Sequence, residues 1–377
     1  MRRRLEQIES PGERDASERA WRVVRSAFAE YEPRLPARRS IGLAAGTAAA
    51  AVVALVLVAV SPAGPALVRT VRNAVGSEHA ERALVALPAS GRLLVDSGAG
   101  SWIVNADGSK RLLGRYASSS WSPHGLFEIV ARGHELAAVD PKGSVRWSIE
   151  REGAVRDPRW SPDGYRVAYQ AGSSLRVVAG DGTGDRPLAA NVAAVSPEWQ
   201  PGSAHALAYV TRTGAVRIVN TDTGASVAYW RGRNRPLRLV WSADGKLLLS
   251  LGHRTIDVRT SGLARVESLL LRDTTIVAAA WAPQGDRYAL IGYQPAHDRS
   301  IAVIRPLHGA PRNVFVGTGR IDGVNWSPNA RWLLLAWRTA DQWVFARTSG
   351  ARRIHAVASI SSQFHSRAFP RLAGWCC

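Results

Sequence analysis

A short motif recurs six times in this chain at nearly constant spacing. Its clearest copy is Trp160-Ser161-Pro162-Asp163-Gly164, followed over residues 165–170 by apolar residues alternating with polar or small ones. The six tryptophans are Trp121, Trp160, Trp199, Trp241, Trp281 and Trp326, with separations of 39, 39, 42, 40 and 45 residues. A period of about 40 residues is typical of repeats that each form one small antiparallel sheet, so the chain is predicted to be a ring of such units.

The residues of the motif explain where the strands begin and end. Pro162 cannot donate to a sheet ladder, and Asp163-Gly164 favours a tight turn, so the tryptophan is predicted to end a strand. A glycine for a second turn follows each tryptophan by 21 to 28 residues, at Gly143, Gly182, Gly224, Gly262, Gly309 and Gly350. We interpret the tryptophans as packing between neighbouring sheets and not as ligand contacts.

A weaker unit precedes the first tryptophan and an incomplete one ends the chain. Leu87 takes the tryptophan position, and Gly91 and Asp107-Gly108 match the two turns. Residues 369–375, which include Trp375, read as one strand without its hairpin. We therefore predict an all-β fold over residues 84–377. It is a β-propeller of seven blades, each a four-stranded sheet, closed by the C-terminal strand; six or eight blades stay open as alternatives.

The W-S-P-D-G repeats resemble the WD40-like repeats of the TolB type, over roughly residues 84–377. No unit ends in the Gly-His and Trp-Asp pairs of true WD40 repeats, and the chain has no room for the α/β domain that precedes the propeller in TolB. The resemblance implies a propeller in a bacterial protein and leaves the function open, because one fold serves many functions.

Residues 1–40 are predicted to be a cytoplasmic head. Ser10-Pro11-Gly12-Glu13 has the form of a capping box with proline at the first helical position, and Ala20, Val24 and Phe28 follow at helical spacing. One amphipathic helix cannot bury its apolar face alone. It is expected to lie on the membrane, on a second copy or on a cytoplasmic protein partner, and these alternatives stay open.

Residues 41–62 are predicted to be a transmembrane helix, since Ile41 to Val60 are twenty residues without a charge. Residues 63–83 would then form a stalk. The arginines of the head favour a cytoplasmic N-terminus and an extracytoplasmic propeller. A cleaved signal peptide is the competing interpretation, with Ser61-Pro62-Ala63 as a loose cleavage site.

The formal net charge is +19, and only Lys110, Lys142 and Lys246 are lysines among 49 basic residues. Much of this arginine content is explained by a GC-rich genome. One local concentration is Arg231, Arg233, Arg235 and Arg238, preceded by Tyr229 and Trp230. Four guanidiniums could bind phosphates or acidic sugars of a polyanion, and a solvated loop is the alternative. An extracytoplasmic position argues against nucleic acid.

No catalytic or metal-binding motif is present. G-x-S-x-G, the Walker A loop and H-E-x-x-H are all missing, and the nine histidines lack metal-ligand spacing. Asp181 and Asp185 are interpreted as turn residues, so no cofactor and no metal are predicted. Cys376 and Cys377 are the only cysteines; we expect them to be unpaired, or to form an intermolecular disulfide on the oxidising side.

The sequence therefore predicts a non-catalytic, single-pass membrane protein of the cell envelope. Its propeller would bind an envelope polymer or protein outside and could relay binding to a cytoplasmic partner. Two alternatives stay open. One is an envelope hydrolase or lyase with carboxylates at the propeller axis, and the other is a regulator whose layout resembles that of membrane-tethered anti-sigma factors.

Overall fold

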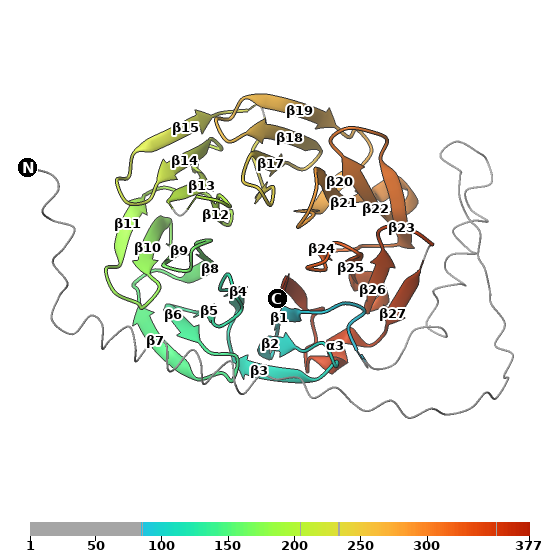
Figure 1. The fold of residues 1–377 in the computed structure, drawn as a ribbon, viewed down its shortest axis with the longest axis horizontal. Helices are drawn as coiled ribbons and strands as arrows, with labels where there is room; N and C mark the ends of the chain where they lie inside the picture. Colours follow the sequence, from blue (N-terminus) through green and yellow to red (C-terminus); the bar gives the residue numbers. More distant parts are fainter. Residues whose placement is uncertain (1–83, 85, 204, 233, 352) are drawn as a thin grey trace, which may run out of the picture. The chain divides into compact units, whose positions relative to one another are not determined.

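A computed structural model describes residues 84, 86–203, 205–232, 234–351 and 353–377. They form seven four-stranded antiparallel sheets around one axis (Figure 1), which confirms the predicted all-β seven-bladed propeller. In the described part of the chain, no helix has the length and apolarity that crossing a bilayer requires. The head, the membrane span and the stalk predicted for residues 1–83 lie outside the described residues.

Each blade runs from an innermost strand at the axis to an outermost strand at the rim. Blade 1 is β28 (Arg371–Cys376), β1 (Arg92–Ser97), β2 (Gly100–Val104) and β3 (Lys110–Gly114). Blade 2 is β4 (Ser118–Trp121), β5 (Glu128–Arg132), β6 (Glu135–Val139) and β7 (Val145–Glu150). Blade 3 is β8 (Val155–Trp160), β9 (Arg166–Ala171), β10 (Ser174–Ala179) and β11 (Arg186–Ala189). Blade 4 is β12 (Glu198–Trp199), β13 (Ala206–Val210), β14 (Val216–Asn220) and β15 (Ser226–Trp230).

The remaining blades follow the same order. Blade 5 is β16 (Arg238–Trp241), β17 (Leu247–Leu251), β18 (Thr255–Thr260) and β19 (Arg265–Leu270). Blade 6 is β20 (Thr275–Trp281), β21 (Arg287–Gln294), β22 (Arg299–Pro306) and β23 (Arg312–Thr318). Blade 7 is β24 (Gly323–Trp326), β25 (Trp332–Trp337), β26 (Gln342–Arg347) and β27 (Ile354–Val357). Short helices of the described chain lie in the connections: η1 (Pro295–His297), η2 (Arg338–Ala340) and α3 (Ile360–Gln363).

Blade 1 joins the two ends of the propeller sequence. The last strand, β28, pairs antiparallel with β1, with Trp375 opposite Leu93 and Gly374 opposite Leu94. The innermost strand of blade 1 thus comes from the C-terminal end of the propeller sequence, and the other three strands of the blade come from its N-terminal end. Leu87, which was expected in the tryptophan position, lies outside any strand; it is buried, and its N–H donates to the carbonyl of Ala106.

Each repeated tryptophan ends the innermost strand of its blade, and four of the rings reach the preceding blade by a hydrogen bond. In each case the indole Nε1 donates to the backbone carbonyl of the residue just before the preceding tryptophan. The bonds are Trp199 to Arg159 (3.0 Å), Trp241 to Glu198 (3.2 Å), Trp281 to Val240 (3.1 Å) and Trp326 to Ala280 (2.9 Å). These bonds link five consecutive blades, from blade 3 to blade 7, close to the axis.

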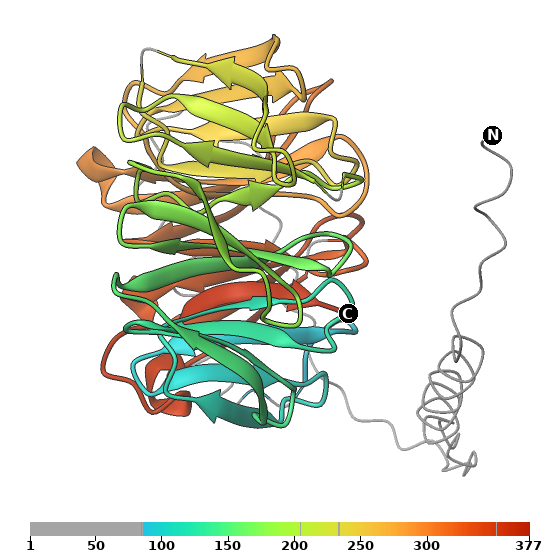
Figure 2. The same ribbon diagram turned by 90° about the vertical axis from the view of Figure 1, so that its left-hand side faces the viewer.

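The faces of the disc follow from the antiparallel order of the strands. One face, the joining face, carries the loops that lead from an outermost strand to the next innermost strand, together with the turns between second and third strands. Backbone hydrogen bonds tie these segments together, for example Arg151 N to His134 O and Arg212 N to Asn191 O. The other face, the hairpin face, carries the turns after the repeated tryptophans and the turns between third and fourth strands. Seen from the edge of the disc, the strands run between these two faces (Figure 2).

Candidate functional site

The predicted arginine cluster is divided by the structure. Residues 231–237 join β15 to β16 on the joining face, where Arg231 and Arg235 are exposed. Arg233 is outside the described residues. Arg238 is the first residue of β16, the innermost strand of blade 5, so it belongs to the axis and not to the loop. The described part of the cluster is thus divided between the loop and the first residue of β16, and the binding role predicted for the four arginines stays a prediction.

Each of the two aromatic rings before the loop has another arginine beside it. The guanidinium of Arg259 lies 3.8 Å from the centre of the Trp230 ring, and that of Arg217 lies 5.4 Å from the centre of the Tyr229 ring. Gly232 packs against Trp230, with no space for a Cβ. Trp230 therefore packs against Arg259 and Gly232. Among the described residues it does not pair with Arg231 or Arg235, so these arginines can contact another partner.

The innermost strands present alternate residues to the axis. Along β16, Arg238 is exposed, Leu239 is buried and Val240 is half-buried. The same alternation in blades 3 and 4 leaves Arg159 and Glu198 partly exposed, while Pro158 is buried between blades. The partly exposed positions form the axial surface, which solvent reaches. On this surface, blades 3 to 5 supply Asp157, Arg159, Glu198 and Arg238.

Three arginines from different blades influence one another electrostatically at the axial surface. Arg238 is open to solvent along the axis, but the surrounding strands displace part of its hydration, which is the main cause that lowers its pKa. The positive charges of Arg159 and Arg371 lower the pKa further, whereas Glu198 opposes the shift. Arg371 comes from β28 of blade 1, so its influence on blade 5 acts across the axis. Arg238 keeps its charge at neutral pH, since arginine is not deprotonated in proteins.

Two of these arginines already have partners, and the third does not. Arg371 Nη2 lies 2.6 Å from Asp96 Oδ2, and Arg159 Nε lies 3.7 Å from Glu198 Oε1. Burial raises the pKa of Asp96 and of Glu198, and the neighbouring arginines act in the opposite direction. Within the described ranges, Arg238 forms no ion pair and no side-chain hydrogen bond. It is therefore a positive charge available to a ligand that approaches along the axis.

The joining face as a whole is dominated by arginine. Four exposed acidic residues lie on its described part, Glu150, Glu152, Asp273 and Asp298. The exposed arginines there are Arg115, Arg132, Arg212, Arg231, Arg235, Arg238, Arg254, Arg272, Arg320, Arg338, Arg367 and Arg371. Guanidiniums in this excess form a surface that attracts anionic groups and can bind them by paired N–H donors.

The hairpin face has a different composition. All three lysines lie in or beside its turns, at Lys110, Lys142 and Lys246, and its exposed acidic residues are Asp107, Asp181, Asp222, Asp244 and Asp286. Charges on this face are mixed, and several are paired with each other. Exposed arginines lie here as well, at Arg111, Arg146, Arg265, Arg312, Arg331 and Arg353. The faces therefore differ in the proportion of basic to acidic residues, which is higher on the joining face.

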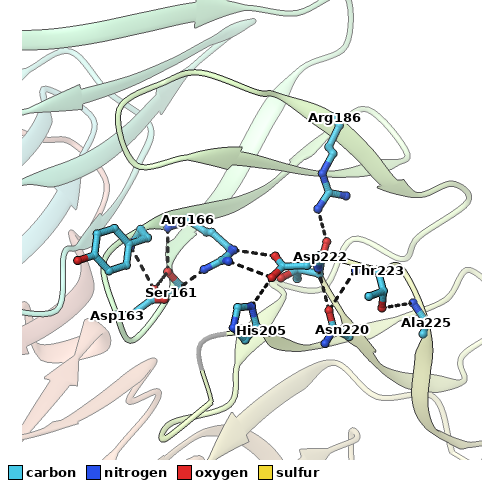
Figure 3. A network of polar contacts seen from close by, with 11 residues as sticks. Ser161, Asp163, Arg166, Arg186, His205, Asn220, Asp222, Thr223 and Ala225 are labelled. Carbon is cyan, nitrogen blue, oxygen red and sulfur yellow. Dashed lines mark hydrogen bonds and ion pairs between the residues drawn. The ribbon is translucent and has the colours of Figure 1, made fainter. Parts of the chain in front are cut away.

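One network on the hairpin face links blades 3 and 4 (Figure 3). Asp222 accepts two hydrogen bonds from Arg166, 3.0 Å from Nε and 3.1 Å from Nη2, and lies 2.6 Å from Nδ1 of His205. Arg186 adds a hydrogen bond to the carbonyl of Thr221. The carboxylate is used within the protein, and this network therefore joins blades.

The described residues contain no group of three or more histidine, cysteine or acidic side chains that could hold a metal ion. Asp185 contributes to a cleft of about 600 Å³ beside Glu150 and Glu152. Its carboxylate is paired with Arg176 and, at 2.6 Å, with Arg151, and it accepts a hydrogen bond from the Tyr169 hydroxyl. These partners hold Asp185 in a structural ion pair.

Cys376 and Cys377 are joined by a disulfide, which corrects the expectation that they are unpaired or bridge two chains. Cys376 ends β28, and Cys377 is exposed beside the turn that contains Pro123, on the hairpin face. The two cysteines are adjacent in the sequence, which was the reason to expect strain in a bridge. The same adjacency holds the two sulfurs close enough to bond.

Comparison with known proteins identifies the fold alone. No protein-family model matches the sequence, and no curated protein matches it. Among solved structures, Kluyveromyces lactis Hsv2 is 13% identical, covering 71% of this chain and 93% of that chain, with a TM-score of 0.55. A chain of the Mitotic Checkpoint Complex is 15% identical over 71% of this chain and 94% of that chain, with a TM-score of 0.55. The WD40 domain of Toxoplasma gondii coronin is 15% identical over 64% of this chain and 70% of that chain, with a TM-score of 0.50.

The chain is a seven-bladed β-propeller with WD40-like structural neighbours. At these identities the likeness shows the architecture and nothing about ligands. The architecture supports binding or scaffolding, and the composition of the joining face and of the axial surface narrows what can be bound.

Proposed function

We propose that this protein is a membrane-anchored binding propeller of the cell envelope, and that its joining face binds an anionic polymer or an anionic protein surface. The observation that carries the proposal is the excess of exposed arginines on that face, with Arg231, Arg235 and Arg238 unpaired in the described part of the chain. A bound anion would be held by the guanidiniums of the loop together with Arg238 at the axis, where partial loss of hydration strengthens the contact with Arg238.

The anchor and the orientation rest on the sequence. Residues 41–62 have the length and apolarity of a transmembrane helix, and the arginine-rich head favours a cytoplasmic N-terminus. In this arrangement the propeller lies outside the cytoplasm, where the anionic ligand would be a polymer of the cell envelope. The head could relay binding to a cytoplasmic partner, in a layout that resembles membrane-tethered anti-sigma factors.

A matched pair of variants tests the binding proposal. Full-length protein would be titrated with inorganic polyphosphate and with polygalacturonate, one a phosphate polymer and one an acidic sugar polymer. We expect Arg231→Gln/Arg235→Gln/Arg238→Gln to weaken binding by about 10-fold to 100-fold at low salt. The control, Arg111→Gln/Lys142→Gln/Lys246→Gln, removes three charges from the hairpin face and should change the affinity by less than about 2-fold. Equal losses in both variants would show unspecific attraction to a basic chain and would contradict the proposal.

Orientation needs its own test. Single cysteines at Ser17 and Ser144, in a background without Cys376 and Cys377, would be labelled in intact cells with an impermeant reagent. Ser144 is exposed in a turn of the hairpin face, and its side chain is not needed for the turn. Labelling at position 144 alone supports an extracytoplasmic propeller. Labelling at position 17 alone would invert the orientation and make nucleic acid and inner-leaflet lipids the anions to examine.

Catalysis is the alternative, and it would depend on Asp157 and Glu198, the two carboxylates of the axial surface in blades 3 and 4. Each has a partner: Ser196 Oγ donates to Asp157 Oδ1 at 2.8 Å, and Arg159 faces Glu198. Asp96, a third carboxylate near the axis, is buried against Arg371. A hydrolase or lyase would release new chain ends from polygalacturonate, and Glu198→Gln would stop that release.

A further inference from the structure

The disulfide between Cys376 and Cys377 lies in a defined environment on the hairpin face, away from the arginines of the joining face. Cys376 is opposite Arg92 in the pairing of β28 with β1. Cys377 Sγ lies 4.0 Å from the carbonyl oxygen of Pro123, in the turn that follows Trp121. The two sulfurs therefore lie where the closing strand of blade 1 meets blade 2, and Cys377 is open to solvent.

Gly125 shows how closely the groups at this point converge. A Cβ added there would lie 2.7 Å from Arg92 Nη2, 3.0 Å from Cys377 Sγ and 3.5 Å from Cys376 Sγ. The guanidinium and both sulfurs thus surround one position that carries no side chain. Gly125 has φ of +63°, a backbone conformation that glycine adopts without strain.

Arg92 is held in place beside the sulfurs. Its Nη2 donates to the carbonyl of Gly125 at 2.6 Å, and its guanidinium lies 4.9 Å from the centre of the Trp121 ring. A fixed positive charge next to a thiol favours the thiolate, which is the form that attacks electrophiles and binds soft ions. The reduced pair would therefore be more reactive than two cysteines on a free peptide.

The carboxylate that interacts with the charge of Arg92 does little to cancel it. Glu128 begins β5 and is fully buried, and neither of its oxygens has a hydrogen-bond partner in the described part of the chain. Burial raises the pKa of Glu128 to about 8, which Arg92 opposes and Asp140 reinforces. At neutral pH Glu128 is mostly uncharged, so the charge of Arg92 acts on the sulfurs.

We propose that Cys376 and Cys377 form a reversible dithiol site, and that the reduced pair binds a thiophilic metal or metalloid ion through both sulfurs. Reduction by an external dithiol transfers two electrons and two protons to the pair and leaves the reductant as a disulfide. A trivalent arsenical with one oxygen then forms two As–S bonds, and that oxygen leaves as water with the two thiol protons. Soft thiolates are the ligands that such ions prefer.

Phenylarsine oxide is the probe for the test. Full-length protein is reduced, freed of reductant and incubated with one equivalent. The expected product carries one probe less one water, by intact mass, and melts at a higher temperature than the reduced protein, because a ligand held by the native closing strand stabilises the fold. Cys376→Ser and Cys377→Ser should each lose the adduct.

Two comparisons separate a built site from the chemistry of any adjacent cysteines. The folded chain should bind the probe at least about 10-fold more tightly than the same chain in denaturant. Alkylation of the reduced pair by iodoacetamide at pH 7 should slow by about 3-fold to 10-fold in Arg92→Gln, and Arg92→Lys should restore most of the rate. Arg111→Gln, on β3 of the same blade, should leave the rate unchanged.

Three results would overturn the proposal. One is an absence of adduct on the reduced native protein, and another is equal affinity in the native and denatured chains. The third is an alkylation rate in Arg92→Gln equal to that of the wild type. In each case the disulfide would form only because the two cysteines are adjacent, and the surrounding residues would not make a binding site.

Discussion

Trp241 Nε1 donates a hydrogen bond of 3.2 Å to the backbone carbonyl of Glu198, the residue directly before the tryptophan of the preceding blade. The same relation joins Trp199 to Arg159. The tryptophans that define the repeat thus fix the backbone of the two charged residues that face each other on the axial surface. The packing of the repeated tryptophans therefore also positions residues of the candidate site.

The hydrogen bonds of these indoles should have a measurable effect on stability. Trp281→Phe removes the bond to the Val240 carbonyl, whereas Trp160→Phe removes an N–H that has no partner in the described ranges. Both changes shorten a packed aromatic ring. We expect Trp281→Phe to lower the free energy of unfolding by about 1 kcal/mol more than Trp160→Phe, measured by denaturant titration. Equal losses would mean that the hydrogen bonds are not what links the blades.

Glu128 should make stability depend on pH. Its pKa is about 8 in the folded protein, above the ordinary value of 4.5, so the folded state binds more protons between those limits. The free energy of unfolding must therefore fall as pH rises from about 4.5 to 8. Glu128→Gln should flatten this slope and raise stability at pH 7 by about 2 kcal/mol, measured by urea unfolding across the range. Glu150→Gln, on the exposed strand β7, is the control, and a slope unchanged in Glu128→Gln would refute the assignment.

The network of Asp222 should contribute modestly. Asp222 is 42% exposed and its partner Arg166 is 22% exposed, so water and salt screen the pair. Asp222→Asn should cost about 1 kcal/mol at low salt, and less as salt increases. Asp244→Asn breaks a more exposed pair with Lys246 and should cost close to nothing. Thermal melts of both variants at two salt concentrations give the comparison, and a large, salt-independent loss would point to a packing role.

Arg371 should be the most sensitive of the axial arginines. Asp96 is buried, and Arg371 is the cation that faces it, with Ser101 and Ser119 supplying the other hydrogen bonds. Arg371→Gln leaves a buried carboxylate without a cation and should cost about 3 kcal/mol. Arg367→Gln changes an exposed residue of the preceding loop and should cost less than about 0.5 kcal/mol. If the two variants unfold alike, the pair does not hold β28.

The sequence was sufficient to predict the propeller architecture, because the motif that indicates it lies within a few consecutive residues of each unit. A tryptophan before a Pro-Asp-Gly-like turn, repeated every 40 residues or so, specifies a strand end and a hairpin in each of six units. The weaker unit at Leu87 led to the prediction of seven blades, with six or eight as alternatives. The axial arginines could not be found in this way. Arg159, Arg238 and Arg371 are far apart in the chain, and only closure of the ring by β28 brings them together.

The structure divides the predicted arginine cluster for a local reason. Four arginines in eight residues were taken as one loop, but β16 begins at Arg238, and strand alternation directs that side chain to the axis. The half-buried alternation of the innermost strands, applied blade by blade, would have identified the axial positions. The difference between the two faces also needed the strand directions, since arginines of the joining face are scattered along the propeller sequence.

Arginine footprinting tests the central proposal most directly. Full-length protein is modified with phenylglyoxal in the presence and absence of the bound polymer, and each arginine is followed by mass spectrometry. We predict that Arg231, Arg235 and Arg238 lose reactivity by about 3-fold or more when the polymer is bound, while Arg111 and Arg353 of the hairpin face react as before. Equal protection on both faces, or protection of the hairpin face alone, would contradict an anion-binding joining face.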